Sequence, residues 1–150
     1  MQTTAQDLET IIDRHLPALK TIPEGEYTFK SSPEKWSKKE ILGHLIDSAQ
    51  SNIRRFIVAQ YEDEPKILYN QDKWVVISNY QQWEIADLIN LWYLLNKQIS
   101  IILRNTPSEM YQRKCLTQSM HTIEWLANDY VKHLLHHLHV VLDLEPVAYS

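Results

Sequence analysis

The chain of 150 residues contains only two glycines, Gly25 and Gly43, where average usage of ~7% would give about 10. Glycine supplies the positive backbone dihedrals that tight turns need and the open backbone that wraps phosphate groups. Its scarcity therefore disfavours both an all-β fold and a glycine-rich phosphate-binding loop. Because 44% of the residues are apolar and 23% charged, the chain is typical of globular proteins, and we expect a helical fold in a single domain over residues 1–150.

Apolar residues recur at helical spacing in four segments of the chain. Pro17 lies inside the first segment and is expected to kink or interrupt that helix. Ser37 and Glu40 form a capping box at the start of the second. Thr122 is the expected cap of the fourth, which we expect to run to Pro146. The predicted helices span about residues 4–20, 37–60, 82–104 and 122–145.

The connection between the second and third predicted helices is about 20 residues long. This is much longer than the 2–8 residues that usually join antiparallel neighbours. A short helix or turn is expected near residues 72–76 of this connection, and residues 22–36 are expected to form a loop. The length of the connection indicates a parallel pair of helices joined by one long crossover. The sequence therefore predicts an all-α four-helix bundle.

The charge balance and the cysteine content limit the partners of the protein. Fifteen basic and nineteen acidic residues give a net charge of −4, so nucleic acid is not an expected partner. Cys115 is the single cysteine and fits a reducing compartment. Neither a signal peptide nor an apolar run of ~18 residues is present, so we expect a cytoplasmic protein with no membrane span.

Four of the seven histidines fall within seven residues near the end of the chain, at His133, His136, His137 and His139. Residues four apart lie on one side of a helix, so His133 and His137 can bind one metal ion. A helical wheel places this pair on or beside the apolar face. His136 and His139 point away from that face and are expected to be solvated.

A two-histidine site needs a further ligand, and His15, His44 and His121 are the candidates. His15 lies on the apolar stripe of the first helix, either as a ligand or as a core histidine with one hydrogen-bond partner. His44 lies on a polar stripe that faces either solvent or a wet cavity between helices. Periodicity does not decide between these alternatives. The polar stripe consists of Glu40, His44, Asp47, Ser51 and Arg55.

Two segments of the sequence are similar to motifs of the DinB/YfiT family. The first is PEKWSKKEILGHLIDSAQSNIRRF at residues 33–56, and the second is WLANDYVKHLLHHLHVV at residues 125–141. The resemblance implies a four-helix bundle in which His44, His133 and His137 hold one divalent metal ion, with nickel or zinc favoured. It also implies a homodimer. Val140 stands at the position where many relatives have Gln.

Three neutral imidazoles would leave a divalent ion one open coordination position, as in catalytic metal sites. The resemblance implies an enzyme that activates a small thiol, or water, toward a small electrophile, and thus a metal-dependent transferase or hydrolase. In this hypothesis Asp47 orients His44 or accepts a proton. Arg55 either binds an anionic group of the substrate or forms a surface ion pair. The alternatives are a non-enzymatic module that binds metal or a small molecule, such as one induced by stress, and a plain oligomerisation bundle.

Overall fold

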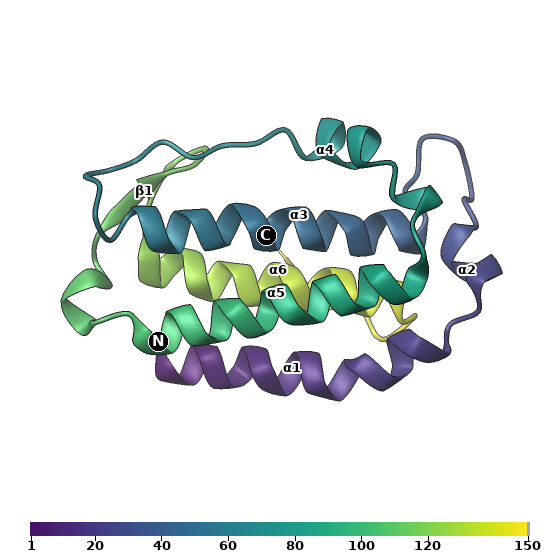
Figure 1. Cartoon of the computed structure of the whole chain (residues 1–150), viewed down its shortest axis with the longest axis horizontal. Helices are drawn as coiled ribbons and strands as arrows, with labels where there is room; N and C mark the ends of the chain where they lie inside the picture. The colour runs from purple at the N-terminus through teal and green to yellow at the C-terminus, as the bar shows by residue number, and fades with distance from the viewer. Residues whose placement is uncertain (150) are drawn as a thin grey trace.

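Four long helices form the body of the protein in the computed structural model, which describes residues 1–149. Each long helix packs against two others, in the cyclic order α1, α5, α3, α6. Figure 1 shows α1 and α6 running in one direction and α3 and α5 in the other. The predicted four-helix bundle is thus confirmed. The helices are α1 (Gln2–Thr21), α3 (Lys38–Val58), α5 (Ile85–Asn105) and α6 (Ile123–Val141).

The core lies between the four helices, each of which turns its apolar face inward. Fully burying one large aliphatic or aromatic side chain contributes roughly 1.5–3 kcal/mol, so this shared interior supplies most of the stabilisation. The spacing of these residues along each helix is the pattern that the sequence showed. Fully buried members include Leu8 and Ile12 of α1, Leu45 of α3, Trp92 and Ile99 of α5, and Leu134 and Leu138 of α6.

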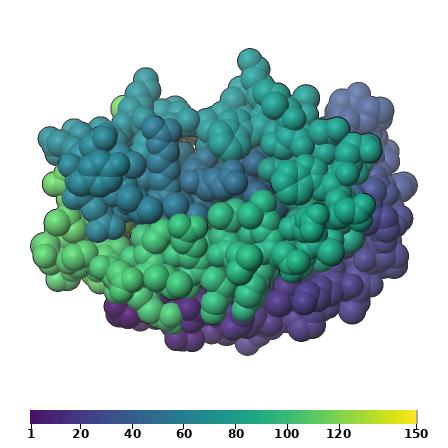
Figure 2. All heavy atoms as spheres, viewed as in Figure 1, coloured from purple at the N-terminus to yellow at the C-terminus, as the bar shows by residue number. Residues whose placement is uncertain are grey.

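The helices α3 and α5 are parallel, as the length of their connection predicts. Gln60, just after α3, donates to the hydroxyl of Thr106, just after α5, at 3.3 Å, so the two helices end side by side. The crossover spans residues 59–84 and contains α4 (Gln71–Ser78), near the predicted short helix, and the 3₁₀ helix η1 (Tyr80–Gln82). Figure 2 shows the crossover along one edge of the bundle, with part of α3 visible between its two halves.

Three local predictions require correction. The helix α1 is not interrupted at Pro17 but continues to Thr21, because Leu19 is buried and its carbonyl accepts a 2.6 Å hydrogen bond from Tyr27. Tyr27 belongs to a short helix, α2 (Glu24–Thr28), within the predicted loop. The helix α6 ends at Val141, before Pro146, because the chain turns at Asp143, which has a φ of 53°.

A small hairpin precedes α6 and was not predicted. It follows the 3₁₀ helix η2 (Ser108–Met110) and pairs β1 (Lys114–Leu116) with β2 (Met120–Thr122). The crossover joins it through Ile67, whose N–H donates to the carbonyl of Leu116 at 2.9 Å. Hairpin and crossover therefore form a continuous wall at one end of the bundle. None of the helices described is long and apolar enough to span a membrane.

Candidate metal centre and adjoining pocket

The first turn of α3 sets the direction in which His44 points. The Ser37 N–H donates to the Glu40 carboxylate, and the Glu40 N–H donates to the Ser37 hydroxyl, both at 3.1 Å, so the predicted capping box is present. His44 follows seven residues after the cap, about two turns later, and is only 1% exposed. The Trp36 ring lies 5.0 Å from the His44 ring. His44, on the polar stripe of α3, therefore points into the protein rather than into solvent.

The structure brings His44, His133 and His137 together. The Nε2 atoms of His44 and His133 are 3.1 Å apart. One ring nitrogen from each of the three residues lies within 4.8 Å of the other two. The α6 pair is one helical turn apart, and the Thr122 hydroxyl caps α6 by accepting from the Trp125 N–H at 3.1 Å. Two antiparallel helices thus present three imidazoles to one point.

These three side chains fit a metal ion by their geometry. Two nitrogen ligands at 2.0–2.1 Å from a tetrahedral zinc ion lie about 3.3 Å from each other. The His44–His133 separation of 3.1 Å is close to this value. The other ring nitrogen of His44, Nδ1, is buried and has no hydrogen-bond partner in the part of the chain that is described. Imidazole nitrogens are ligands that zinc and nickel accept readily.

Burial keeps the three imidazoles neutral, which is the form that binds a cation. Loss of hydration lowers the pKa of His44 to about 4, of His133 to about 3 and of His137 to about 4. Repulsion from the neighbouring histidines adds to this effect. At neutral pH each of the three rings is therefore uncharged and has one unprotonated nitrogen that can bind a cation.

The other candidate histidines lie outside the cluster. His15 on α1 is half-buried, with its ring 6.0 Å from that of His139. His121 stacks on Trp125 with the ring centroids 3.6 Å apart. His136 and His139 were predicted to be solvated, but they are half-buried, with Nδ1 atoms 2.6 Å from the carbonyls of Val147 and Glu145 respectively. They hold the C-terminal segment back along α6.

Asp47 lies one turn after His44 and is 1% exposed. Its Oδ1 accepts a short hydrogen bond from the hydroxyl of Tyr80, and its Oδ2 has no partner within the described residues. Burial raises the pKa of Asp47 to about 6, although the bond from Tyr80 favours the ionised form. No hydrogen bond joins Asp47 to His44 among the described residues. Asp47 instead connects α3 to the crossover.

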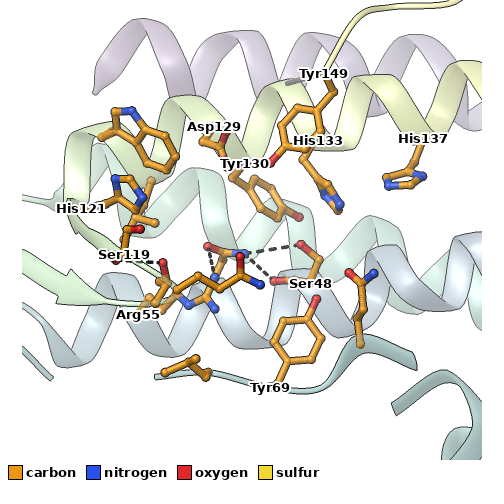
Figure 3. A pocket seen from close by; sticks show the side chains of 17 residues that line it. Ser48, Arg55, Tyr69, Ser119, His121, Asp129, Tyr130, His133, His137 and Tyr149 are labelled. Carbon is orange, nitrogen blue, oxygen red and sulfur yellow. Dashed lines mark hydrogen bonds between the residues drawn. The ribbon is translucent and has the colours of Figure 1, made fainter. Parts of the chain in front are cut away.

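A pocket of about 500 Å³ opens beside the cluster. Figure 3 shows His133 and His137 on one side and Arg55 at the opposite end. Its walls come from α3, the crossover, the hairpin and α6, and Arg55 is the member of the polar stripe that lines it. Its lining includes Ser48, Asn52 and Arg55 of α3, Leu68, Tyr69 and Gln71 of the crossover, residues 117–119 and His121 of the hairpin, and Asp129, Tyr130, His133 and His137 of α6.

Arg55 forms no ion pair with any described residue, contrary to one of its two predicted roles. Its Nε and Nη2 atoms donate to the carbonyl of Ile67 at 3.2 and 3.1 Å. Sequence reasoning missed Tyr80, Tyr69 and the hairpin tip as part of this region. Gly43 was the available signal for Tyr80, because a glycine inside a helix indicates a close approach by another group.

The fold resembles two solved structures of low sequence identity. YfiT from Bacillus subtilis, described as a probable metal-dependent hydrolase with an unusual four-helix bundle topology, superposes with a TM-score of 0.85 at 19% identity, covering 94% of this chain and 83% of that one. A mycothiol-dependent maleylpyruvate isomerase gives a TM-score of 0.71 at 14% identity, covering 97% of this chain and 61% of that one.

No curated protein matches the chain. The DinB superfamily model, in contrast, matches residues 7–141, which include all four long helices almost completely. The chain belongs to the DinB superfamily.

Proposed function

We propose that this protein is a metal-dependent transferase or hydrolase in which His44, His133 and His137 hold one divalent ion, nickel or zinc. The observation that carries this proposal is the convergence of three neutral imidazoles beside a pocket of about 500 Å³. The description of YfiT as a probable metal-dependent hydrolase supports a hydrolytic reaction, and the mycothiol dependence of the isomerase supports a thiol. A bound ion would lower the pKa of a water or thiol at its open position.

The side chains around the cluster would position the reactants. Trp36 packs beside His44 and limits its movement. The Tyr149 ring lies 5.3 Å from that of His133 and covers part of the pocket. We assign Asp47 the role of proton acceptor, because its Oδ2 is buried without a partner among the described residues. The nucleophile would be a small thiol or water, and its target a small electrophile.

A metal- or small-molecule-binding module without catalysis is the second candidate. Val140 favours it, since this position holds Gln in many relatives, and an apolar side chain cannot orient a water molecule. Val140 is 47% exposed and lines a second hollow, of about 430 Å³, on the other side of His137. The two candidates share the metal site and differ in whether a reaction follows.

The metal content of the protein tests the shared site. Protein purified without a nickel column, and then dialysed against zinc or nickel, should retain one ion per chain by elemental analysis. His137→Ala should lose it, whereas His136→Ala, which changes the neighbouring histidine on α6, should keep it. A wild-type protein that retains no ion contradicts the proposal. Full stoichiometry in His44→Ala would show that His44 is not the third ligand.

The reaction is tested separately on the metal-loaded protein. A panel of small thiols combined with alkylating electrophiles, together with ester and amide substrates for hydrolysis, should give a rate that His44→Ala abolishes. The same panel should remain active with His15→Ala, because His15 lies on α1 outside the cluster and outside the pocket lining. A loaded protein that is inactive toward every member would favour the binding module.

A further inference from the structure

Arg55 is a cation that faces the pocket with two of its hydrogen-bond donors unused. A guanidinium group has five N–H donors. Nε and Nη2 each donate to Ile67, and Nη1 donates to Asn52 at 3.4 Å. This leaves one N–H on each terminal nitrogen without a partner in the described part of the chain. The Ile67 carbonyl also fixes the plane of the group, so its orientation is set before any ligand binds.

None of the described residues that line the pocket forms an ion pair with Arg55. Asp129 is the one carboxylate among the described lining residues, and it lies beyond ion-pair distance from Arg55. Its Oδ2 accepts a 2.9 Å hydrogen bond from Tyr149. A partly buried charge without a paired charge is costly, and an anion from solution would remove that cost. The site is therefore suited to a carboxylate, whose two oxygens can each accept from one terminal nitrogen.

The distance between Arg55 and the histidines sets the length of such a ligand. Arg55 follows His44 by 11 residues, slightly more than three full turns, so both residues lie on the same face of α3. At 1.5 Å per residue their Cα atoms are about 16 Å apart along the helix axis. Figure 3 shows Arg55 and His137 at opposite ends of the pocket. A ligand that reaches both ends has to be elongated.

We propose that Arg55 forms a carboxylate-binding subsite that selects an elongated small molecule, with its carboxylate at Arg55 and its reactive sulfur at His44, His133 and His137. The assignment of sulfur to the histidine end depends on the proposed function, whereas the assignment of carboxylate to Arg55 does not. Ser48 and Asn52 lie on the α3 wall between the two ends and offer polar contacts to the middle of the ligand.

Linear ω-mercapto acids and the matching alcohols test this subsite by calorimetric titration of the metal-loaded protein. The probes are mercaptopropionate, mercaptohexanoate and mercaptoundecanoate, with mercaptopropanol, mercaptohexanol and mercaptoundecanol as neutral partners. We expect one of the longer acids to bind about 10- to 100-fold more tightly than its alcohol, as expected for a charge-assisted hydrogen bond worth ~1.5–3 kcal/mol. Mercaptopropionate is too short to reach both ends and should show little preference.

Two arginine variants separate the subsite from a general effect of charge. Arg55→Gln should abolish the preference for the acid, whereas Arg54→Gln should retain it, because Arg54 is the exposed neighbour outside the pocket. Should the loss of the Ile67 contact prevent Arg55→Gln from folding, Arg55→Lys keeps the charge and should retain part of the preference. Equal binding of acid and alcohol by the wild type overturns the subsite, and so does a preference that Arg55→Gln retains.

The same titrations with metal-free protein distinguish the subsite from the proposed function. Without the ion, every probe should bind more weakly, but the longer acids should still bind more tightly than their alcohols. A preference for acids that persists in both forms, with no gain from the ion, would overturn the thiol part of the proposed function and leave the subsite intact. If the ion tightens the binding of the probes but acids bind no more tightly than alcohols, the subsite is overturned and the thiol part of the proposed function stands.

Discussion

Gly43 allows the crossover to pack directly on the backbone of α3. A Cβ atom at this position would lie 2.1 Å from Cδ2 of the Tyr80 ring and 2.3 Å from its Cγ. Because glycine has no Cβ, the ring rests on the helix, and its hydroxyl reaches Asp47 one turn later. The absence of a side chain at Gly43 therefore allows Tyr80 to lie where its hydroxyl can donate a hydrogen bond to Oδ1 of Asp47.

Gly43→Ala should destabilise the protein by about 1–3 kcal/mol, the usual cost of overpacking, even though alanine favours helices by ~1 kcal/mol over glycine. Urea unfolding followed by circular dichroism measures the change. Gly25→Ala is the matched control, since no atom lies within 4 Å of the Cβ it would add, and it should be neutral or slightly stabilising. A Gly43→Ala protein more stable than the wild type would show that Tyr80 moves aside without cost.

His44 shows what one sequence can and cannot predict about the site. The spacing of His133 and His137 already placed both on one side of α6, because that relation is internal to a helix. The position of His44 on a polar stripe was equally consistent with solvent and with a wet cavity, because this depends on which helix packs alongside. The family motifs favoured His44, and the structure places its ring nitrogen 3.1 Å from that of His133.

The elements differ in how well local sequence predicts them. The four long helices were predicted to within a few residues at most ends, since each repeats its apolar face over several turns. The strands β1 and β2 have three residues each, too few to show alternation, and are held by pairing with each other and with the crossover. The five-residue helix α2 likewise depends on the burial of Tyr27. Tertiary contacts formed these elements, so local patterns did not reveal them.

The caps of α3 and α4 should differ in their effect on stability. Ser37→Ala removes the capping box of a core helix and a 2.7 Å hydrogen bond to Gln81, and should lower the free energy of unfolding by about 1–2 kcal/mol. Asn70→Ala removes the cap of α4, a 3.0 Å bond from the Lys73 N–H, on a short element outside the bundle. It should mainly increase hydrogen exchange in residues 71–78.

Global urea unfolding and hydrogen exchange, measured on both variants, separate these two effects. The difference follows from position, because α3 contacts two other helices of the bundle, whereas α4 packs mainly on α3. Equal losses of global stability in the two variants would mean that the crossover unfolds together with the bundle. In that case the crossover would be part of the cooperative core rather than a layer added to it.

Buried histidines make the stability of the metal-free protein depend on pH. In the unfolded chain a histidine has a pKa near 6.5, whereas burial lowers the pKa of His44 and His137 to about 4 and of His133 to about 3. Below pH 6.5 the unfolded chain therefore binds more protons than the native protein, and acidification favours unfolding. Asp47 acts in the opposite direction, because its pKa is raised to about 6 and its native form takes up a proton first.

Three histidines outweigh one carboxylate, so the melting temperature of the metal-free protein should fall between pH 7 and pH 5.5. The free energy of unfolding should fall by about 1 kcal/mol for each of the three histidines between pH 7 and pH 5.5. The protonation of Asp47 should offset a smaller part of this loss. His133→Gln, which removes one titrating group, should flatten the profile. Saturating zinc should raise the melting temperature at pH 7, and the increase should diminish toward pH 5.5 as protons compete for the same nitrogens. A profile that is flat or rises on acidification, in the metal-free wild type, would contradict the neutral buried cluster on which the proposed metal site depends.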